Sequence, residues 1–235
     1  MRALSRGASF VELFVAIFLS SLLIVLMLHE QMRYTLVIKK LRQTIVLDAQ
    51  WAYVSALLRQ HLHMAGYTPC GSLRHLITMD RRTGHALKPL VFSTALAPRL
   101  SLYHMSLPVR EVEVLDSAHT LTLQEPLGVR AAVILLSDCY HAEVHTVDSI
   151  QGRVLRVKEP WLYTYHAPMF LGVFSEEWFE VTPKHGLMMQ HDELWPIVEG
   201  MSFEERTLHH QTRLTVHLKL PHGEEKSITS GLRTP

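Results

Sequence analysis

The sequence predicts an α+β fold in which one long N-terminal helix packs on an antiparallel β-sheet domain. Neither glycine nor proline occurs between Gly7 and Gly66. Helix breakers then follow together at Pro69 and Gly71, and from Leu90 onward apolar residues tend to recur at every second position. The first pattern is typical of a helix and the second of half-buried strands, so the chain divides near residue 66 into a helix and a β-rich head.

The first half of the predicted helix is apolar enough to cross a membrane. Arg6–Leu28 reads RGASFVELFVAIFLSSLLIVLML, and its run of about twenty mainly apolar residues matches the roughly 30 Å hydrocarbon core of a bilayer. Arg2 and Arg6 favour a cytoplasmic N-terminus, which places the head across the membrane. A cleavable secretory signal is disfavoured, because its apolar region is only about 7 to 15 residues long.

One acid, Glu12, interrupts the apolar run near its start. A charge at the centre of a membrane span costs roughly 2.5 to 3.5 kcal/mol, so a carboxylate there is a functional hypothesis that requires a partner. If the chain were cut after Gly7, the new α-amine of Ala8 would lie one helical turn from Glu12, where an i, i+4 ion pair can form. The alternative is a plain signal anchor with an incidental glutamate.

Beyond residue 28 the predicted helix becomes amphipathic, and at 1.5 Å per residue the whole helix would be on the order of 85 Å long. Its apolar residues recur at spacings of three and four, at Leu47, Trp51, Val54, Leu58, Leu62 and Ala65. Polar residues populate its other faces. We interpret the apolar stripe as the face that packs against the sheet.

Alternating segments predict strands in the head. They cover residues 111–114, 119–123 and 213–220, and the more continuous apolar run 129–136 predicts a central strand. Prolines 108, 126, 160, 183 and 221 are expected to fall between strands, because proline cannot donate to the ladder. The aromatic stretch Trp161–Phe179 shows no clear period.

Composition indicates one globular domain plus one membrane span. The 235 residues are 48% hydrophobic and 19% charged. With a formal net charge of +1, the chain offers no electrostatic case for binding nucleic acid.

Cys70 and Cys139 lie beyond the span, and an oxidising compartment favours a disulfide between them over two buried free thiols. Closing that loop would stabilise the fold by roughly 4 kcal/mol.

Sixteen histidines invite a metal hypothesis. His61 and His63 point to different faces of a helix, so they cannot share an ion. His141, Glu143 and His145 would share one face of a strand, but the alternate residues of that strand are mainly apolar. We therefore interpret the three as its solvent-facing side and expect no metal.

The sequence lacks the familiar catalytic signatures. G-x-S-x-G, the P-loop and G-x-G-x-x-G do not occur, and the two cysteines are too far apart for a C-x-x-C motif. We expect no enzymatic activity and no cofactor.

The N-terminus resembles the type III signal of type IV pilins and pseudopilins. The matching residues are Gly7, Ala8 and Glu12, preceded by the basic Arg2 and Arg6; the family usually has phenylalanine or methionine where Ala8 stands. The resemblance implies that a prepilin peptidase cuts after Gly7 and N-methylates Ala8. It also implies a leader at 1–7, a transmembrane half-helix at 8–28, an amphipathic half at 29–66 and a periplasmic head at 67–235.

Three further segments resemble PilW-like minor pilins. Ala56–Cys70 (ALLRQHLHMAGYTPC) is similar to the end of their long helix, and Leu135–Cys139 (LLSDC) to their second cysteine strand. Leu194–Arg233, with WPIVEG at its start, is similar to their C-terminal block. Residues 71–120 match least.

This resemblance implies a type IV pilin-like fold and a non-catalytic role in starting or capping a type IV pilus, as part of a minor-pilin tip complex. The implied partners are prepilin peptidase, other minor pilins, the major pilin and a large tip adhesin. The implied location is the inner membrane, with a periplasmic head, and then the pilus fibre or its tip. Two alternatives stay open: a J-type minor pseudopilin of type II secretion, and a membrane-tethered periplasmic enzyme or binding module.

Overall fold

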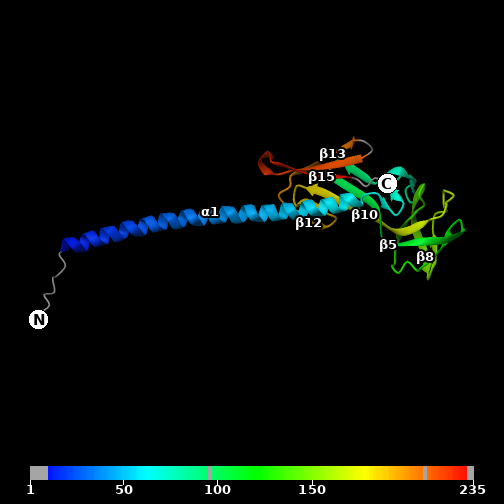
Figure 1. Ribbon diagram of the computed structural model, residues 1–235, viewed down its shortest axis with the longest axis horizontal. Helices are drawn as coiled ribbons and strands as arrows, with labels where there is room; N and C mark the ends of the chain where they lie inside the picture. The colour runs from blue at the N-terminus through cyan, green and yellow to red at the C-terminus, as the bar shows by residue number, and fades with distance from the viewer. Residues whose placement is uncertain (1–9, 95–96, 209–210, 232–235) are drawn as a thin grey trace. The chain divides into compact units, whose positions relative to one another are not determined.

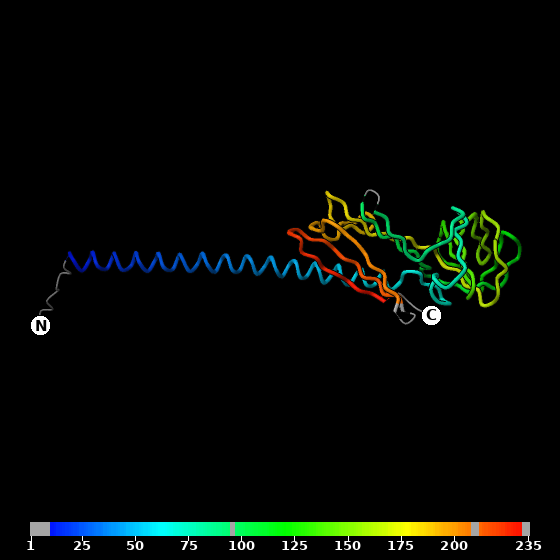
Figure 2. Tube along the Cα trace, turned by 90° about the horizontal axis from the view of Figure 1, so that it is seen from above, coloured from blue at the N-terminus to red at the C-terminus, as the bar shows by residue number. Residues whose placement is uncertain are grey.

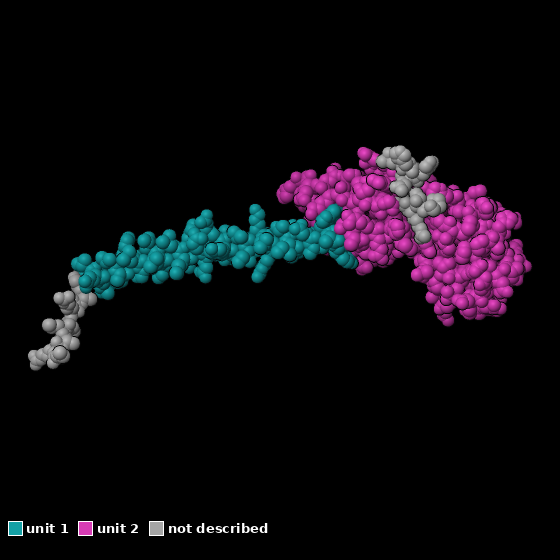
Figure 3. Space-filling view, in the orientation of Figure 1, with its two compact units in different colours: residues 1–53 teal, residues 54–235 magenta. Residues whose placement is uncertain are grey.

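The structure is a computed structural model that describes residues 10–94, 97–208 and 211–231, and it divides into two compact units (Figure 1, Figure 3). In the first unit, residues 1–53, the described part is entirely helical. The second unit, residues 54–235, holds the last turns of that helix and every described strand. The second unit is the head.

The long helix predicted from the sequence is present as α1, Phe10–Met64, which is continuous over 55 residues. It ends where Gly66 adopts a left-handed φ of +75° and donates its N–H to Tyr103 O at 2.7 Å. A Cβ at Gly66 would lie 2.7 Å from the Pro89 side chain and 2.9 Å from that of Ser72. Glycine is therefore needed here both for its conformation and for the close approach of its neighbours.

The apolar stripe of α1 is shorter than the sequence predicts. Val54, Leu58 and Leu62 are completely buried, whereas Leu47 is 40% exposed and Trp51 is only partly buried. Burial of the large apolar side chains thus begins at Val54, the first residue of the head. The last three turns of the helix are part of the core of the head, packed on its antiparallel strands.

The head contains two short 3-10 turns, η1 (Leu73–His75) and η2 (Pro221–Gly223), and fifteen strands among the described residues. The strands are β1 (Tyr67–Thr68), β2 (Gly71–Ser72), β3 (Ile77–Asp80), β4 (Leu90–Ser93), β5 (Arg99–Ser117), β6 (Thr120–Leu123), β7 (Val133–Ser137), β8 (His141–Gln151), β9 (Val154–Val157), β10 (Phe170–Thr182), β11 (Gly186–Met189), β12 (Asp192–Trp195), β13 (Gly200–Leu208), β14 (Gln211–Lys219) and β15 (Glu225–Gly231).

Most strands belong to one large sheet with the order β12-β11-β10-β7-β8-β9-β6-β5-β4. An additional pairing between the two longest strands, β5 and β10, closes six strands into a ring. Alternate residues of these strands pack into one buried cluster, which includes Val112, Leu121, Ile134, Leu155 and Leu171. The strands β13, β14 and β15 form a separate antiparallel sheet and run side by side in Figure 2.

Several strand predictions are confirmed. Residues 119–123 and 213–220 correspond closely to β6 and β14, and residues 111–114 lie inside the much longer β5. The predicted central strand at 129–136 begins four residues late, at Val133, but β7 is indeed central, between β10 and β8. The stretch Trp161–Phe179 is irregular until β10 begins at Phe170.

The expectation that Pro108 separates strands is wrong, because this proline lies inside β5. Opposite it, the pairing of β10 shifts: Leu171 faces Arg110, but Val173 faces Ser106. Residues 107–109 therefore stand in a β-bulge, where a residue without an N–H costs no ladder hydrogen bond.

One pairing in the large sheet is parallel, although the sequence predicts an antiparallel sheet. β3 pairs with β8 from Ile77 opposite His141 to Asp80 opposite Val144. β8 begins two residues after Cys139 and β3 seven residues after its disulfide partner Cys70, and Ile77 N donates to Tyr140 O at 2.8 Å. The bridge thus brings the starts of the two strands together.

Replacing the buried Leu58 by alanine should lower the free energy of unfolding by about 2 to 5 kcal/mol, because a fully buried leucine leaves a cavity. Urea unfolding of the full chain in detergent micelles measures this. Leu36→Ala is the matched control, since Leu36 is 68% exposed on the same helix. Equal effects of the two substitutions would contradict the packing of the helix end in the head.

Candidate functional site

The first unit presents apolar side chains on all sides of the helix. Every large hydrophobic side chain from Phe10 to Leu28 is between 48% and 72% exposed. Among the described residues, α1 is the one helix that is long and apolar enough to cross a membrane. A signal sequence near the N-terminus would meet the same criteria of length and apolar composition. Length and composition thus support a membrane anchor, as the sequence predicts.

The polar groups within this apolar segment are few and partly satisfied internally. Ser20 Oγ donates to Ala16 O at 2.5 Å, and Ser21 Oγ donates to Phe18 O at 2.8 Å. Because these two hydroxyl groups are hydrogen-bonded within the helix, transferring them from water into lipid costs less free energy. The one charged residue between Phe10 and Leu28 is Glu12.

Glu12 lies in the first described turn of α1. The predicted cleavage residues, Gly7 and Ala8, lie outside the described residues, and so does the predicted methylated amine of Ala8. Glu12 is thus near the first described residue of the helix, and both its role in assembly and its pairing with Ala8 stay predictions.

The predicted disulfide is confirmed. Cys70 and Cys139 are bonded, with their Cα atoms 5.0 Å apart and 69 residues apart in sequence. Cys70 joins β1 to β2 directly after the helix, and Cys139 lies in the turn between β7 and β8. The bridge thus ties the end of α1 to the centre of the large sheet.

Next to the bridge, Asp138 is a completely buried carboxylate that three backbone N–H groups hold. Its Oδ1 accepts from Tyr140 N at 2.8 Å and His141 N at 2.5 Å, and its Oδ2 accepts from His166 N at 3.0 Å. Burial alone raises the pKa of Asp138, but these backbone donors outweigh burial and hold the pKa below its ordinary value. The ionised carboxylate fixes both the β7–β8 turn and the segment around residue 166.

The interpretation of His141, Glu143 and His145 as a solvent-facing trio is wrong. Glu143 and His145 are completely buried, and Glu143 Oε2 lies 2.6 Å from His145 Nε2. Glu143 Oε1 accepts the N–H groups of Leu162 at 2.9 Å and Tyr163 at 3.1 Å. The irregular segment after β9 covers this face of β8, so both faces of the strand are buried there.

Aromatic side chains hold that irregular segment in place. The Trp161 ring packs edge-on against His145 at 4.5 Å, and the Tyr163 ring stacks on His141 at 4.6 Å. Trp161 Nε1 also donates to Ser117 O at 2.9 Å. The histidines of the trio thus have a structural use, and no group of three or more potential ligands among the described residues is arranged to hold a metal ion.

His61 lies in the last turn of α1 and contacts the large sheet. No role is predicted for it from the sequence. Its Nδ1 is hydrogen-bonded to Glu177 of β10, and its ring packs edge-on against Phe179. Burial raises the pKa of Glu177, but the bond to His61 and the nearby charges outweigh burial and lower that pKa below its ordinary value. The neighbouring His104 on β5 is buried, and burial lowers its pKa.

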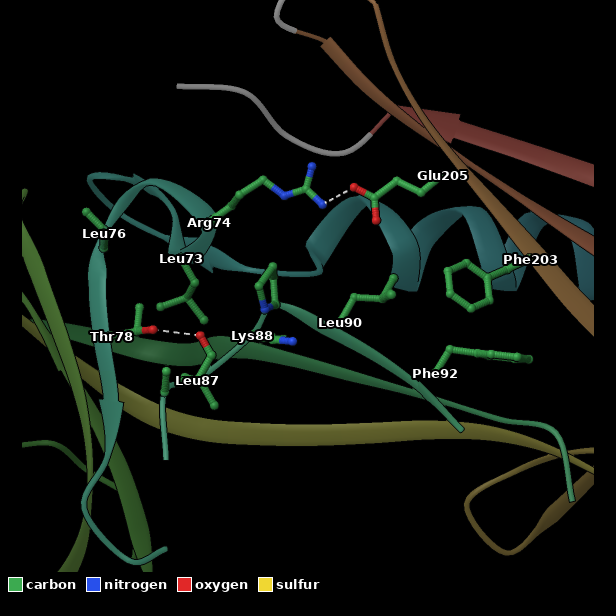
Figure 4. Close-up of a pocket in the computed structure, with 12 residues that line it drawn as sticks. Leu73, Arg74, Leu76, Thr78, Leu87, Lys88, Leu90, Phe92, Phe203 and Glu205 are labelled. Carbon is green, nitrogen blue, oxygen red and sulfur yellow. Dashed lines mark hydrogen bonds and ion pairs between the residues drawn. The ribbon is translucent and has the colours of Figure 1, made fainter. Parts of the chain in front are cut away.

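The head carries a groove of about 470 Å³ between β4 and β13, shown in Figure 4. Phe92 of β4 and Phe203 of β13 meet edge-on at 4.3 Å. Arg74 is paired with Glu205 and donates to Thr212 Oγ1 at 2.6 Å. No sequence pattern predicts this groove, because its lining combines residues 73–92 with Phe203 and Glu205, more than a hundred positions further along the chain.

Comparisons with known proteins do not add to this picture: no protein-family profile, no curated protein and no solved structure matches the chain significantly.

The carboxamide variant Asp138→Asn should lower the free energy of unfolding by about 1 to 3 kcal/mol at neutral pH, because a neutral amide replaces a buried carboxylate that accepts three N–H bonds. The pKa of Asp138 is lowered on folding, so its contribution is present above the unfolded pKa of about 3.9 and is lost as pH falls through the lower folded pKa. The difference from wild type should therefore shrink in strong acid.

Denaturant unfolding from neutral pH down to about pH 2 measures this difference. The exposed Asp192→Asn is the control and should change little at any pH. A deficit of the Asp138 variant that stays constant across the whole range would show that its carboxylate charge is not what holds the turn.

Proposed function

We propose that this chain is a PilW-like minor pilin, a non-catalytic subunit that helps to start or cap a type IV pilus. The observation that supports this most is one continuous helix that begins with a single acid in an otherwise apolar exposed segment and ends in a disulfide-tied β-rich head. Together with the Gly7, Ala8 and Glu12 pattern of the sequence, this arrangement suits a subunit that is first held in lipid and then packed among other helices.

The apolar segment suits both stages. In the inner membrane, the side chains from Phe10 to Leu28 would be in contact with lipid, and the head would be in the periplasm. In a fibre, the same side chains would pack against the apolar helices of other subunits. The segment needs no refolding between the two stages, because lipid and neighbouring helices both offer an apolar surface.

Glu12 would neutralise the N-terminal amine of Ala8, either its own or that of a neighbouring subunit. Desolvation makes an unpaired ammonium unfavourable among packed apolar helices. The helices would therefore pack in the register that brings Glu12 beside an N-terminal amine. The proposed partners are prepilin peptidase, other minor pilins, the major pilin and a large tip adhesin.

The first test of this proposal is the mass of the mature N-terminus. Cleavage between Gly7 and Ala8 followed by N-methylation should give a protein that begins with N-methylalanine, because the basic leader, the glycine and Glu12 form the processing signal. N-terminal peptide mass spectrometry of membrane and fibre fractions checks this. A start at Met1, or a cut after Leu28, would contradict the pilin proposal.

The second test separates assembly from membrane targeting. Glu12→Ala should still insert and be processed, because the substitution raises the apolarity of the span and leaves Gly7 and its basic flank unchanged. Its incorporation into sheared pili should fall at least tenfold, because the variant buries an unpaired amine at a cost of several kcal/mol.

The matched control is Glu30→Ala, since Glu30 is exposed on the same helix and pairs only weakly with Arg33, at 3.4 Å. Mature protein in the membrane and in sheared fibres is compared in cells without the wild-type protein. Normal incorporation of Glu12→Ala would show that this carboxylate is not the assembly contact.

A further inference from the structure

The strand β4 is an edge strand whose outer side is unpaired among the described residues. It ends the order of the large sheet, and β5 is its only partner there. Tyr103 N donates to Pro89 O at 3.0 Å, which fixes the alternation of the ladder. The N–H and C=O groups of Leu90 and Phe92 therefore point away from β5, toward the free edge.

Cavities lie on both faces of this edge. Leu90 and Phe92 line the groove of about 470 Å³ on one face. Val91, between them in sequence, lines a second cavity of about 330 Å³ on the other face, together with Tyr103 and Glu176. Successive side chains of a strand point to opposite faces, so a strand added to β4 would send alternate side chains into the two cavities.

The two cavities differ in chemistry. The first is walled by leucines and by the Phe92–Phe203 pair (Figure 4), which suits apolar side chains. The second is lined by Asp80, Arg82, His85 and Glu176, which suits polar side chains. An added strand that fits both would therefore alternate apolar and polar residues.

The charges around the edge favour a carboxylate on that strand. Each acid that lines the two cavities already has a cation: Asp80 pairs with Arg82 at 2.7 Å, Glu176 with Arg99 at 4.0 Å, and Glu205 with Arg74. Lys88 lines both cavities and is exposed, and no carboxylate of the described residues lies within ion-pair distance of it.

We propose that the edge of β4 binds an extended segment of another protein by strand addition, with alternate apolar residues in the groove and an acidic residue beside Lys88. Backbone bonds to Leu90 and Phe92 would supply affinity, and the two cavities and Lys88 would supply selectivity. This inference goes beyond the proposed function, since it requires neither the membrane nor a fibre. The exposure of Val91, at 41%, fits an apolar edge that a partner covers.

The probes for this proposal are fluorescein-labelled peptides about nine residues long in which valine alternates with threonine. One threonine is replaced by glutamate at each position in turn, or by lysine in a matched set. Fluorescence anisotropy with the full chain in detergent micelles should give at least one glutamate peptide a Kd below about 1 mM. That peptide should bind about five- to tenfold more tightly than its lysine counterpart.

Two sets of variants test how the peptide is held. Lys88→Glu should reverse the preference between glutamate and lysine peptides. Leu90→Pro removes an outward N–H without touching a bond to β5 and should weaken binding at least tenfold, whereas Leu90→Ala keeps that N–H and should weaken it less. Circular dichroism verifies that each variant is folded.

A peptide-side control leaves the protein unchanged. N-methylation of the peptide amides that face β4 should abolish binding, and methylation of the alternate amides should not. The proposal is overturned if no peptide of the panel binds, or if Lys88→Glu and Leu90→Pro both leave binding unchanged. It is also overturned if the full chain self-associates and Leu90→Pro abolishes that association, because the edge then belongs to a second copy.

Discussion

The apolar surface of residues 10–28 is the constraint on which the rest of the structure depends. Each buried leucine, isoleucine or phenylalanine side chain is worth about 1.5 to 3 kcal/mol relative to exposure in water, and this segment exposes many of them in an unbroken run. Within the first unit nothing described covers it. Such a helix requires an apolar environment, and the proposed membrane and assembly stages would each supply one.

The head, in contrast, has a core that does not depend on that segment. Six strands close into a ring around one cluster of buried apolar residues. Val54, Leu58 and Leu62 of α1 are not members of that cluster, but they are also completely buried in the head. The disulfide and the buried carboxylates Asp138 and Glu143 hold the irregular connections around this core. The surroundings of the apolar segment can therefore change while the packing within the head is kept.

How much the sequence predicts depends on whether a feature is local. The uninterrupted helix and the strands β6 and β14 follow from the spacing of nearby residues. The disulfide was predictable for another reason, because the chain has just two cysteines and both lie beyond the predicted span. The closure of β5 on β10 leaves no period in the sequence, and the burial of Glu143 depends on a segment about twenty residues away that covers it. Within the candidate site, Glu12 can be recognised from the sequence, because it is the one charged residue in an apolar run. The groove at β4 combines residues 73–92 with residues 203–205, so only the folded structure shows it.

The central proposal is that the apolar segment exchanges lipid for the helices of other subunits. Photo-crosslinking from position 22 tests it most directly. Leu22 lies in the apolar segment and is 48% exposed. A photoreactive phenylalanine analogue in its place should give lipid adducts in membranes that lack the assembly machinery. In cells that assemble fibres, it should give adducts with the N-terminal helices of other subunits. Adducts confined to the chain's own head in both states would contradict the account.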